Sequence, residues 1–99
     1  MLTKAEIKQK IIENSELLKK YHVSRIGIFG SYINDNASEK SDIDLLVDFS
    51  ETISLLQYVH LSDSITRFLN KKVDLVTVDG IKPAIQNTII NQVEWIEEL

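Results

Sequence analysis

The chain has 99 residues, a formal net charge of −4 and no cysteine, and 43% of its residues are hydrophobic. These values indicate one globular domain over residues 1–99 and exclude disulfide bonds, thiol catalysis and cysteine-ligated metals. The acidic balance and the dispersed lysines argue against direct nucleic-acid binding, and the lack of a long apolar segment or a signal-peptide core argues against a membrane and favours the cytoplasm.

The first half of the chain predicts a helix, a strand and a loop. Thr3 followed by Glu6 forms a capping-box pattern, and the helix that it starts should run to about Lys20. Residues 25–29 are apolar enough for a short buried strand, which Gly30 ends. A short helix could begin after this glycine, and the polar residues 34–41 indicate a loop.

The second half predicts two further strands and two helices. Residues 42–49 alternate between two faces, and residues 53–69 form a helix whose apolar stripe is widened near its start by Leu55, Leu56 and Val59. Residues 73–78 are a third strand, and Pro83 begins a last helix. Residues 93–99 either extend that helix or form a short edge segment. The fold class is therefore α/β (α+β), with a small mixed β-sheet of about three strands flanked by helices.

Three aspartates stand where apolar strand residues are expected. Asp42 and Asp44 lie in the second predicted strand, and Asp74 lies in the third. Aspartate is a poor strand former, and burying it unpaired is costly. Residues i and i+2 of a strand share a face, so Asp42 and Asp44 project together toward a hard cation such as Mg²⁺. Asp74 would add a ligand from a neighbouring strand, and two such ions could clamp a phosphoryl-type transfer. Alternatively, Asp74 pairs with Lys71 or Lys72 at the surface.

Gly30 and Ser31 directly follow the first predicted strand. Glycine permits a sharp turn and the close approach of a phosphate, and a helix beginning at Ser31 would present free amides to it. Taken alone, Gly-Ser is usually a turn and Asp-x-Asp is often a cap or a solvated edge. Together they indicate a site for a nucleoside triphosphate and Mg²⁺. Asp48, at the end of its strand, is given no catalytic role.

The spacing of these features matches a known signature. Gly30-Ser31, ten intervening residues and Asp42-Ile43-Asp44 resemble the Gly-Ser-x10-Asp-x-Asp motif of the DNA polymerase beta-like nucleotidyltransferase superfamily. More closely, residues 26–32, 41–47 and 72–77, with Lys82-Pro83, resemble its minimal nucleotidyltransferase (MNT) branch. The resemblance extends roughly from Ile26 to Ile90.

This resemblance implies a nucleotidyltransferase-type fold and an enzyme. Asp42 and Asp44 would bind two Mg²⁺ ions, Asp74 would be the third carboxylate and help to activate the attacking hydroxyl, and Gly30 and Ser31 would bind the triphosphate. The enzyme would transfer a nucleoside monophosphate, with AMP from ATP as the first choice, to a hydroxyl and release pyrophosphate. Members of this branch are often paired with a helical HEPN ribonuclease toxin, and the MNT protein acts as an antitoxin that can adenylylate a tyrosine of the toxin.

Two other interpretations stay open. Close relatives usually carry Arg-Gly where this chain has Asn34-Asp35, and asparagine cannot supply the charge of a guanidinium beside a triphosphate. This departure favours an antitoxin that neutralises its partner by contact, with weak catalysis. The third interpretation is a small structural domain with incidental aspartates. The sequence leaves the nucleotide, the acceptor and the formation of a homo-oligomer open.

Overall fold

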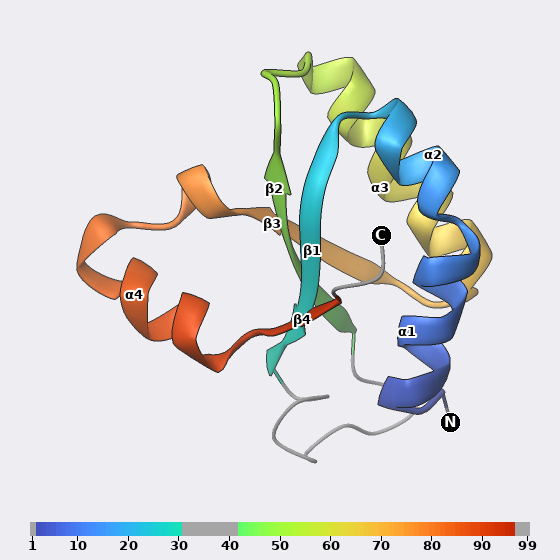
Figure 1. Cartoon of the computed structure of the whole chain (residues 1–99), viewed down its shortest axis with the longest axis horizontal. Coiled ribbons are helices and arrows are strands. Elements are labelled where there is room, and N and C mark those ends of the chain that lie inside the picture. The colour runs from blue at the N-terminus through green and yellow to red at the C-terminus, as the bar shows by residue number, and fades with distance from the viewer. Residues whose placement is uncertain (1, 31–41, 97–99) are drawn as a thin grey trace.

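The computed structural model describes residues 2–30 and 42–96. Figure 1 shows a four-stranded sheet with helices on both sides. The elements are, in chain order, α1 (Lys4–Glu13), α2 (Ser15–Lys20), β1 (Val23–Phe29), β2 (Ile43–Phe49), α3 (Leu55–Leu69), β3 (Val73–Thr77), the 3-10 turn η2 (Val78–Gly80), α4 (Pro83–Gln92) and β4 (Glu94–Ile96). No helix in the described ranges combines the length and the apolar character that crossing a membrane requires.

The sheet has the strand order β3-β2-β1-β4. Strand β1 pairs in antiparallel fashion with β2 and β4, whereas β2 and β3 are parallel and are connected through α3. A parallel pair needs such a crossover because the chain must return to the same end of the sheet before the next strand begins. The starts of β2 and β3 therefore lie side by side, and so do their ends.

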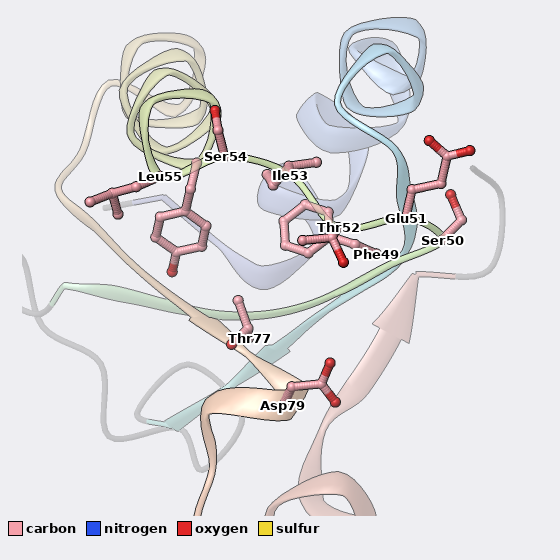
Figure 2. Close-up of a pocket in the computed structure, with 10 residues that line it drawn as sticks. Phe49, Ser50, Glu51, Thr52, Ile53, Ser54, Leu55, Thr77 and Asp79 are labelled. Carbon is pink, nitrogen blue, oxygen red and sulfur yellow. The ribbon is translucent and has the colours of Figure 1, made fainter.

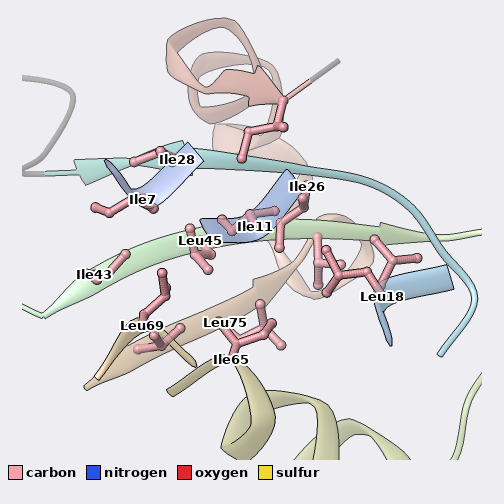
Figure 3. Packing of buried hydrophobic residues seen from close by; sticks show 14 of the residues in the cluster. Ile7, Ile11, Leu18, Ile26, Ile28, Ile43, Leu45, Ile65, Leu69 and Leu75 are labelled. Atoms are coloured by element: carbon pink, nitrogen blue, oxygen red, sulfur yellow. The ribbon is translucent and has the colours of Figure 1, made fainter. Parts of the chain in front are cut away.

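Alternation along the strands builds a separate apolar cluster on each face of the sheet. Residues Ile43, Leu45 and Val47 of β2 are fully buried with α1, α2 and α3, as Figure 3 shows for much of this cluster. Leu46 points the other way, into a smaller cluster with Val78, Ile81 and residues of α4. Three helices thus cover one face, and α4 covers only part of the other (Figure 1). This asymmetry leaves room for a site on the second face.

The predicted helix from Thr3 to Lys20 is wrong in one respect, because the structure divides it at Asn14. The backbone amide of Asn14 donates to the carbonyls of Ile11 and Ile12, and its side chain donates to the carbonyl of Lys10 at 2.7 Å. Asparagine competes for backbone groups in this way, which disfavours helix interiors. The capping box of Thr3 and Glu6 is confirmed.

The mixed sheet is confirmed, but it has four strands, one more than predicted. The segment after α4, for which the sequence left two alternatives, supplies the edge strand β4. It pairs closely with β1, since a Cβ at Gly27 would lie only 2.3 Å from Cγ1 of Val93. The absence of a side chain at Gly27 therefore allows β4 to approach.

The start of α3 differs from the prediction. The stripe through Leu61, Ile65 and Leu69 is buried, but Leu55, Leu56 and Val59 are exposed by 78%, 65% and 44%. A helical apolar pattern cannot distinguish residues that face the core from residues that face solvent beside it. At the other end, Asn70 adopts the left-handed conformation (φ 54°), as expected for a helix-terminating asparagine.

Candidate active site

Asp44 and Asp74 stand opposite each other in the register of β2 and β3. Their neighbours Ile43, Leu45 and Leu75 face the main core, so strand alternation directs both aspartates to the other face. Asp42 precedes Asp44 by two residues. The crossover through α3 therefore brings together carboxylates that are thirty positions apart in sequence, from 44 to 74.

Gly30 lies against the carboxylate of Asp44. It follows Phe29, which pairs with Asp44 in the β1–β2 register. Its φ of +76° belongs to the left-handed region, and a Cβ built on it would lie 2.2 Å from Oδ2 of Asp44. Both the backbone conformation and the contact require glycine at this position. The end of β1 and the start of β2 thus form one compact corner.

The electrostatics of this corner are unfavourable without a cation. Burial raises the pKa of Asp44 above its usual range, and the negative charges of Asp74 and Asp42 raise it further. Asp42 forms an exposed ion pair with Lys72, whose Nζ lies 3.8 Å from Oδ2 of Asp42. Contrary to the expectation of buried carboxylates, Asp42 and Asp74 are exposed and Asp44 is half-buried. The cluster is therefore accessible to a ligand.

These carboxylates suit a hard divalent cation in their chemistry. Mg²⁺ is commonly held by one or two carboxylates together with phosphate oxygens and water. Among residues 2–30 and 42–96, no three acidic or histidine side chains are grouped closely enough to hold a metal ion by themselves. Mutual repulsion keeps like charges apart, and Asp42 is drawn to Lys72. These residues therefore fit a Mg²⁺ site in which two carboxylates supply part of the ligands and substrate oxygens supply the rest. They fit less well a site built from protein ligands alone.

Tyr58 is a residue of this region that sequence reasoning assigned only to the core. Its hydroxyl donates a hydrogen bond to the carbonyl of Leu75, next to Asp74. The amide of Ile43 donates to the carbonyl of Lys72 at 3.0 Å, so alternate carbonyls of β3 face β2 and that of Leu75 faces the free edge. Burial, and then the charge of Asp74, raises the pKa of the Tyr58 hydroxyl. Tyr58 thus fastens α3 to the strand that carries Asp74.

The remaining residues singled out from the sequence fall outside this corner. Ser31, with the short helix expected from it, and the Asn34-Asp35 departure lie outside the described residues. Asp48 pairs with Arg25 at 3.4 Å, and the Arg25 guanidinium stacks 4.1 Å from the centre of the Trp95 ring. Asp48 is thereby occupied in a structural contact, although it shares a strand face with Asp44.

Comparison with known proteins gives a consistent result over nearly the whole chain. Residues 5–98 match the family model for polymerase beta nucleotidyltransferases. The protein adenylyltransferase MntA of Thermococcus cleftensis is 38% identical over 97 residues, which cover 97% of this chain and 98% of that protein.

Two solved structures share the fold. The structure of a proposed minimal nucleotidyltransferase aligns with a TM-score of 0.75 and 28% identity over 91% of this chain and 88% of the other. A chain in the complex of the tri-AMPylated HEPN toxin of Shewanella oneidensis with MNT antitoxin aligns with a TM-score of 0.67 over 94% of this chain and 73% of the other. At 20% identity, this second likeness concerns the fold alone.

Proposed function

Because the chain belongs to the polymerase beta nucleotidyltransferase family, we propose that it transfers AMP from ATP to a hydroxyl of a partner protein, with Mg²⁺, as the antitoxin of a HEPN/MNT pair. The observation that carries the proposal is that Asp44 stands opposite Asp74 in the sheet register and lies against Gly30. This pair supplies converging negative charge beside a backbone that a triphosphate can approach.

In this proposal each residue of the corner has a role. Asp42 and Asp44 would hold Mg²⁺, and Asp74 would join them and accept the proton of the attacking hydroxyl. Gly30 and Ser31 bind the triphosphate. The hydroxyl oxygen forms a bond to the α-phosphorus, the bond from the α-phosphorus to the bridging oxygen breaks, and pyrophosphate leaves. When bound, the metal would stabilise the negative charge that develops during the transfer. The chain's own residues bind, orient and remove the proton.

The acceptor belongs to another protein in this proposal. A transferase must hold its acceptor in line with the bond that breaks. The relative from Thermococcus cleftensis is named a protein adenylyltransferase, and a neighbour in fold occurs with a modified HEPN toxin. A hydroxyl of a HEPN-type partner is therefore the first acceptor to test.

A second function is a binding antitoxin with weak catalysis. The substitution of the family's usual Arg-Gly by Asn34-Asp35 favours it, because a charged donor to the triphosphate is lost and a negative charge is added. Under this alternative, the partner is neutralised by contact alone. Both functions use the same partner, so the test must separate binding from transfer.

Intact-mass spectrometry of the chain and its co-purified partner, after incubation with ATP and Mg²⁺, tests the transferase. The partner should gain adenylyl groups with the wild-type chain and with Asp48→Asn, the matched control on the same strand face. It should gain none with Asp42→Asn/Asp44→Asn. The binding antitoxin would be the function under two results together. The doubly substituted chain would still neutralise the partner, and the wild-type chain would add no mass to the partner from ATP, GTP, CTP or UTP.

A further inference from the structure

The first turns of α3 carry an apolar surface that the fold does not use. Leu55, Leu56 and Val59 are exposed by 78%, 65% and 44%. Val59 follows Leu55 by four residues and Leu56 by three, so the three side chains form one cluster on the helix surface. A single exposed apolar side chain is ordinary, but three at neighbouring positions of one helix end indicate an interaction surface.

A hollow of about 510 Å³ adjoins this cluster. It is lined by the end of β2 and the following turn, by the first turn of α3 with Leu55 and Tyr58, and by Thr77 and Asp79 of the β3–η2 segment. Figure 2 shows Ile53 and Ser54 between Leu55 and Glu51, with Asp79 across the opening. The aromatic residues Phe49 and Tyr58 give it an apolar part. The hollow is large enough to receive side chains of another protein.

The charge of this region is negative. Glu51 and Asp79 line the hollow, and its described lining contains no lysine or arginine. Nδ1 of His22 lies 3.6 Å from Oε2 of Glu51, and both side chains are exposed. A two-fold contact with a second copy would bring this acidic rim toward the same acidic rim. Charge complementarity therefore favours a different protein that carries lysine or arginine.

We propose that Leu55, Leu56 and Val59, with the rim carboxylates of Glu51 and Asp79, form a docking surface for an α-helical segment of the partner protein. The segment carries apolar residues one helical turn apart, which pack on the α3 cluster, and a lysine or arginine that reaches the rim. This mode combines an apolar helix-to-helix contact with a charged pair at its border. We call these five residues the α3 docking surface.

The α3 docking surface lies toward the other end of the strands from the carboxylate corner, and Tyr58 of the adjoining hollow reaches β3 beside Asp74. Asp44 stands near the start of β2 and Phe49 at its end, and five residues of strand span about 16 Å. A partner held at one end of the sheet can therefore present a hydroxyl at the other without blocking it. This inference rests on the proposed function for the identity of the partner, since the HEPN-type protein is the helical protein expected to dock.

Binding of the purified HEPN-type partner, measured by calorimetry without ATP or Mg²⁺, tests the docking surface. The substitutions Leu55→Ser/Leu56→Ser should weaken binding on the order of 100-fold, because they remove apolar area at the centre of the contact that the partner would bury. Ile85→Ser is the matched control: Ile85 is 49% exposed on α4, outside this surface, and its substitution should change binding less than about twofold. Glu51→Lys/Asp79→Lys should weaken binding about tenfold, more at low salt.

Several outcomes would overturn the inference. The inference is overturned if the Leu55→Ser/Leu56→Ser chain binds the partner within about threefold of the wild-type affinity. It is also overturned if Ile85→Ser weakens binding equally, or if the wild-type chain does not bind the partner. A wild-type dimer in sedimentation that the same double substitution dissolves would assign the surface to a second copy. Because binding is measured without nucleotide, a chain that binds through α3 but transfers nothing would contradict only the transferase. Unchanged transfer after Leu55→Ser/Leu56→Ser would contradict only the docking surface.

Discussion

At residue scale, the corner between β1 and β2 depends on the pairing of Gly30 with Asp44. The carboxylate occupies the space where any other residue at position 30 would place its Cβ. The glycine is therefore required by a neighbouring strand as well as by its own positive φ. Such a close approach holds the Asp44 carboxylate beside backbone that has no side chain, where a phosphate could reach both.

We predict that Gly30→Ala destabilises the chain by about 1–2 kcal/mol from the left-handed backbone alone, with a further cost from displacing Asp44. Urea unfolding at equilibrium measures the change. In an Asp44→Ala background the same glycine substitution should cost less, because the displaced carboxylate is absent. An equal cost in both backgrounds would contradict the contact between the two residues.

At element scale, α1 and β4 are joined by ion pairs although they lie at opposite ends of the sequence. Nζ of Lys8 and Nζ of Lys4 lie 3.0 Å and 3.3 Å from Oε2 of Glu94. The close ammonium group of Lys8 lowers the pKa of Glu94, and Lys4 contributes in the same direction, whereas burial opposes them. Since Glu94 begins the three-residue strand β4, these lysines help to hold the edge of the sheet.

The lowered pKa of Glu94 determines the direction in which the stability of the folded chain changes with pH. Glu94 has an ordinary value of 4.5, and its folded value lies below that. Its stabilising effect is therefore present above about pH 4.5 and is lost as the pH falls through the lower folded value. The free energy of unfolding of the wild type should exceed that of Glu94→Gln by less than about 1 kcal/mol near neutral pH, because the carboxylate is partly exposed. The difference should shrink below about pH 4.5 and disappear once the pH lies well below the folded pKa.

Thermal unfolding across this pH range measures the effect. Glu13→Gln is the control, since Glu13 is exposed at the end of α1 and has no ion pair within the described ranges. If the stability difference between wild type and Glu94→Gln grew toward low pH, the stabilising role of the Glu94 ion pairs would be contradicted.

At the scale of the whole molecule, the sheet separates two surfaces. Three helices cover one face, α4 covers part of the other, and Asp44 and Asp74 stay accessible at the start of two parallel strands. The proposed α3 docking surface lies beyond the opposite ends of the same strands. A small domain can in this way offer separate regions for chemistry and for recognition.

We predict that ATP and Mg²⁺ together, each at about 100 times its Kd, raise the melting temperature by about 10–20 °C, whereas either alone has a smaller effect. A ligand at 100 times its Kd stabilises a protein by about 2.7 kcal/mol, and each 1 kcal/mol shifts the melting temperature of a domain this small by about 4–8 °C. Asp44→Asn should abolish the joint shift and Asp48→Asn should keep it. Chelation of Mg²⁺ should reverse it, and an equal shift with ATP alone would speak against a metal-dependent site.

Particular residues show how far the sequence leads and where it fails. The alternation around Asp42 and Asp44 predicted a common face; the structure places Asp44 opposite Asp74 in the sheet, whereas Asp42 precedes the strand and pairs with Lys72. The helix caps at Thr3 and Asn70 could be predicted because they depend only on residues close in sequence. The break at Asn14 was missed because an asparagine within a helical pattern carries only a weak preference against the helix. The exposure of Leu55 and Leu56 was missed because an apolar pattern shows which residues share a side of the helix, but it does not show what packs against that side.

By itself, the sequence determined the residue types of the corner, the strands that carry the aspartates and the family signature that their spacing forms. These properties depend on strand alternation and turn chemistry, which act over a few residues. The tertiary structure decided that Asp44 and Asp74 stand in register, that Gly30 lies against Asp44, that Tyr58 fastens β3 and that β4 closes the sheet edge. Each of these joins residues far apart in the chain, and such contacts are set by the register and packing of whole elements, which no local pattern specifies.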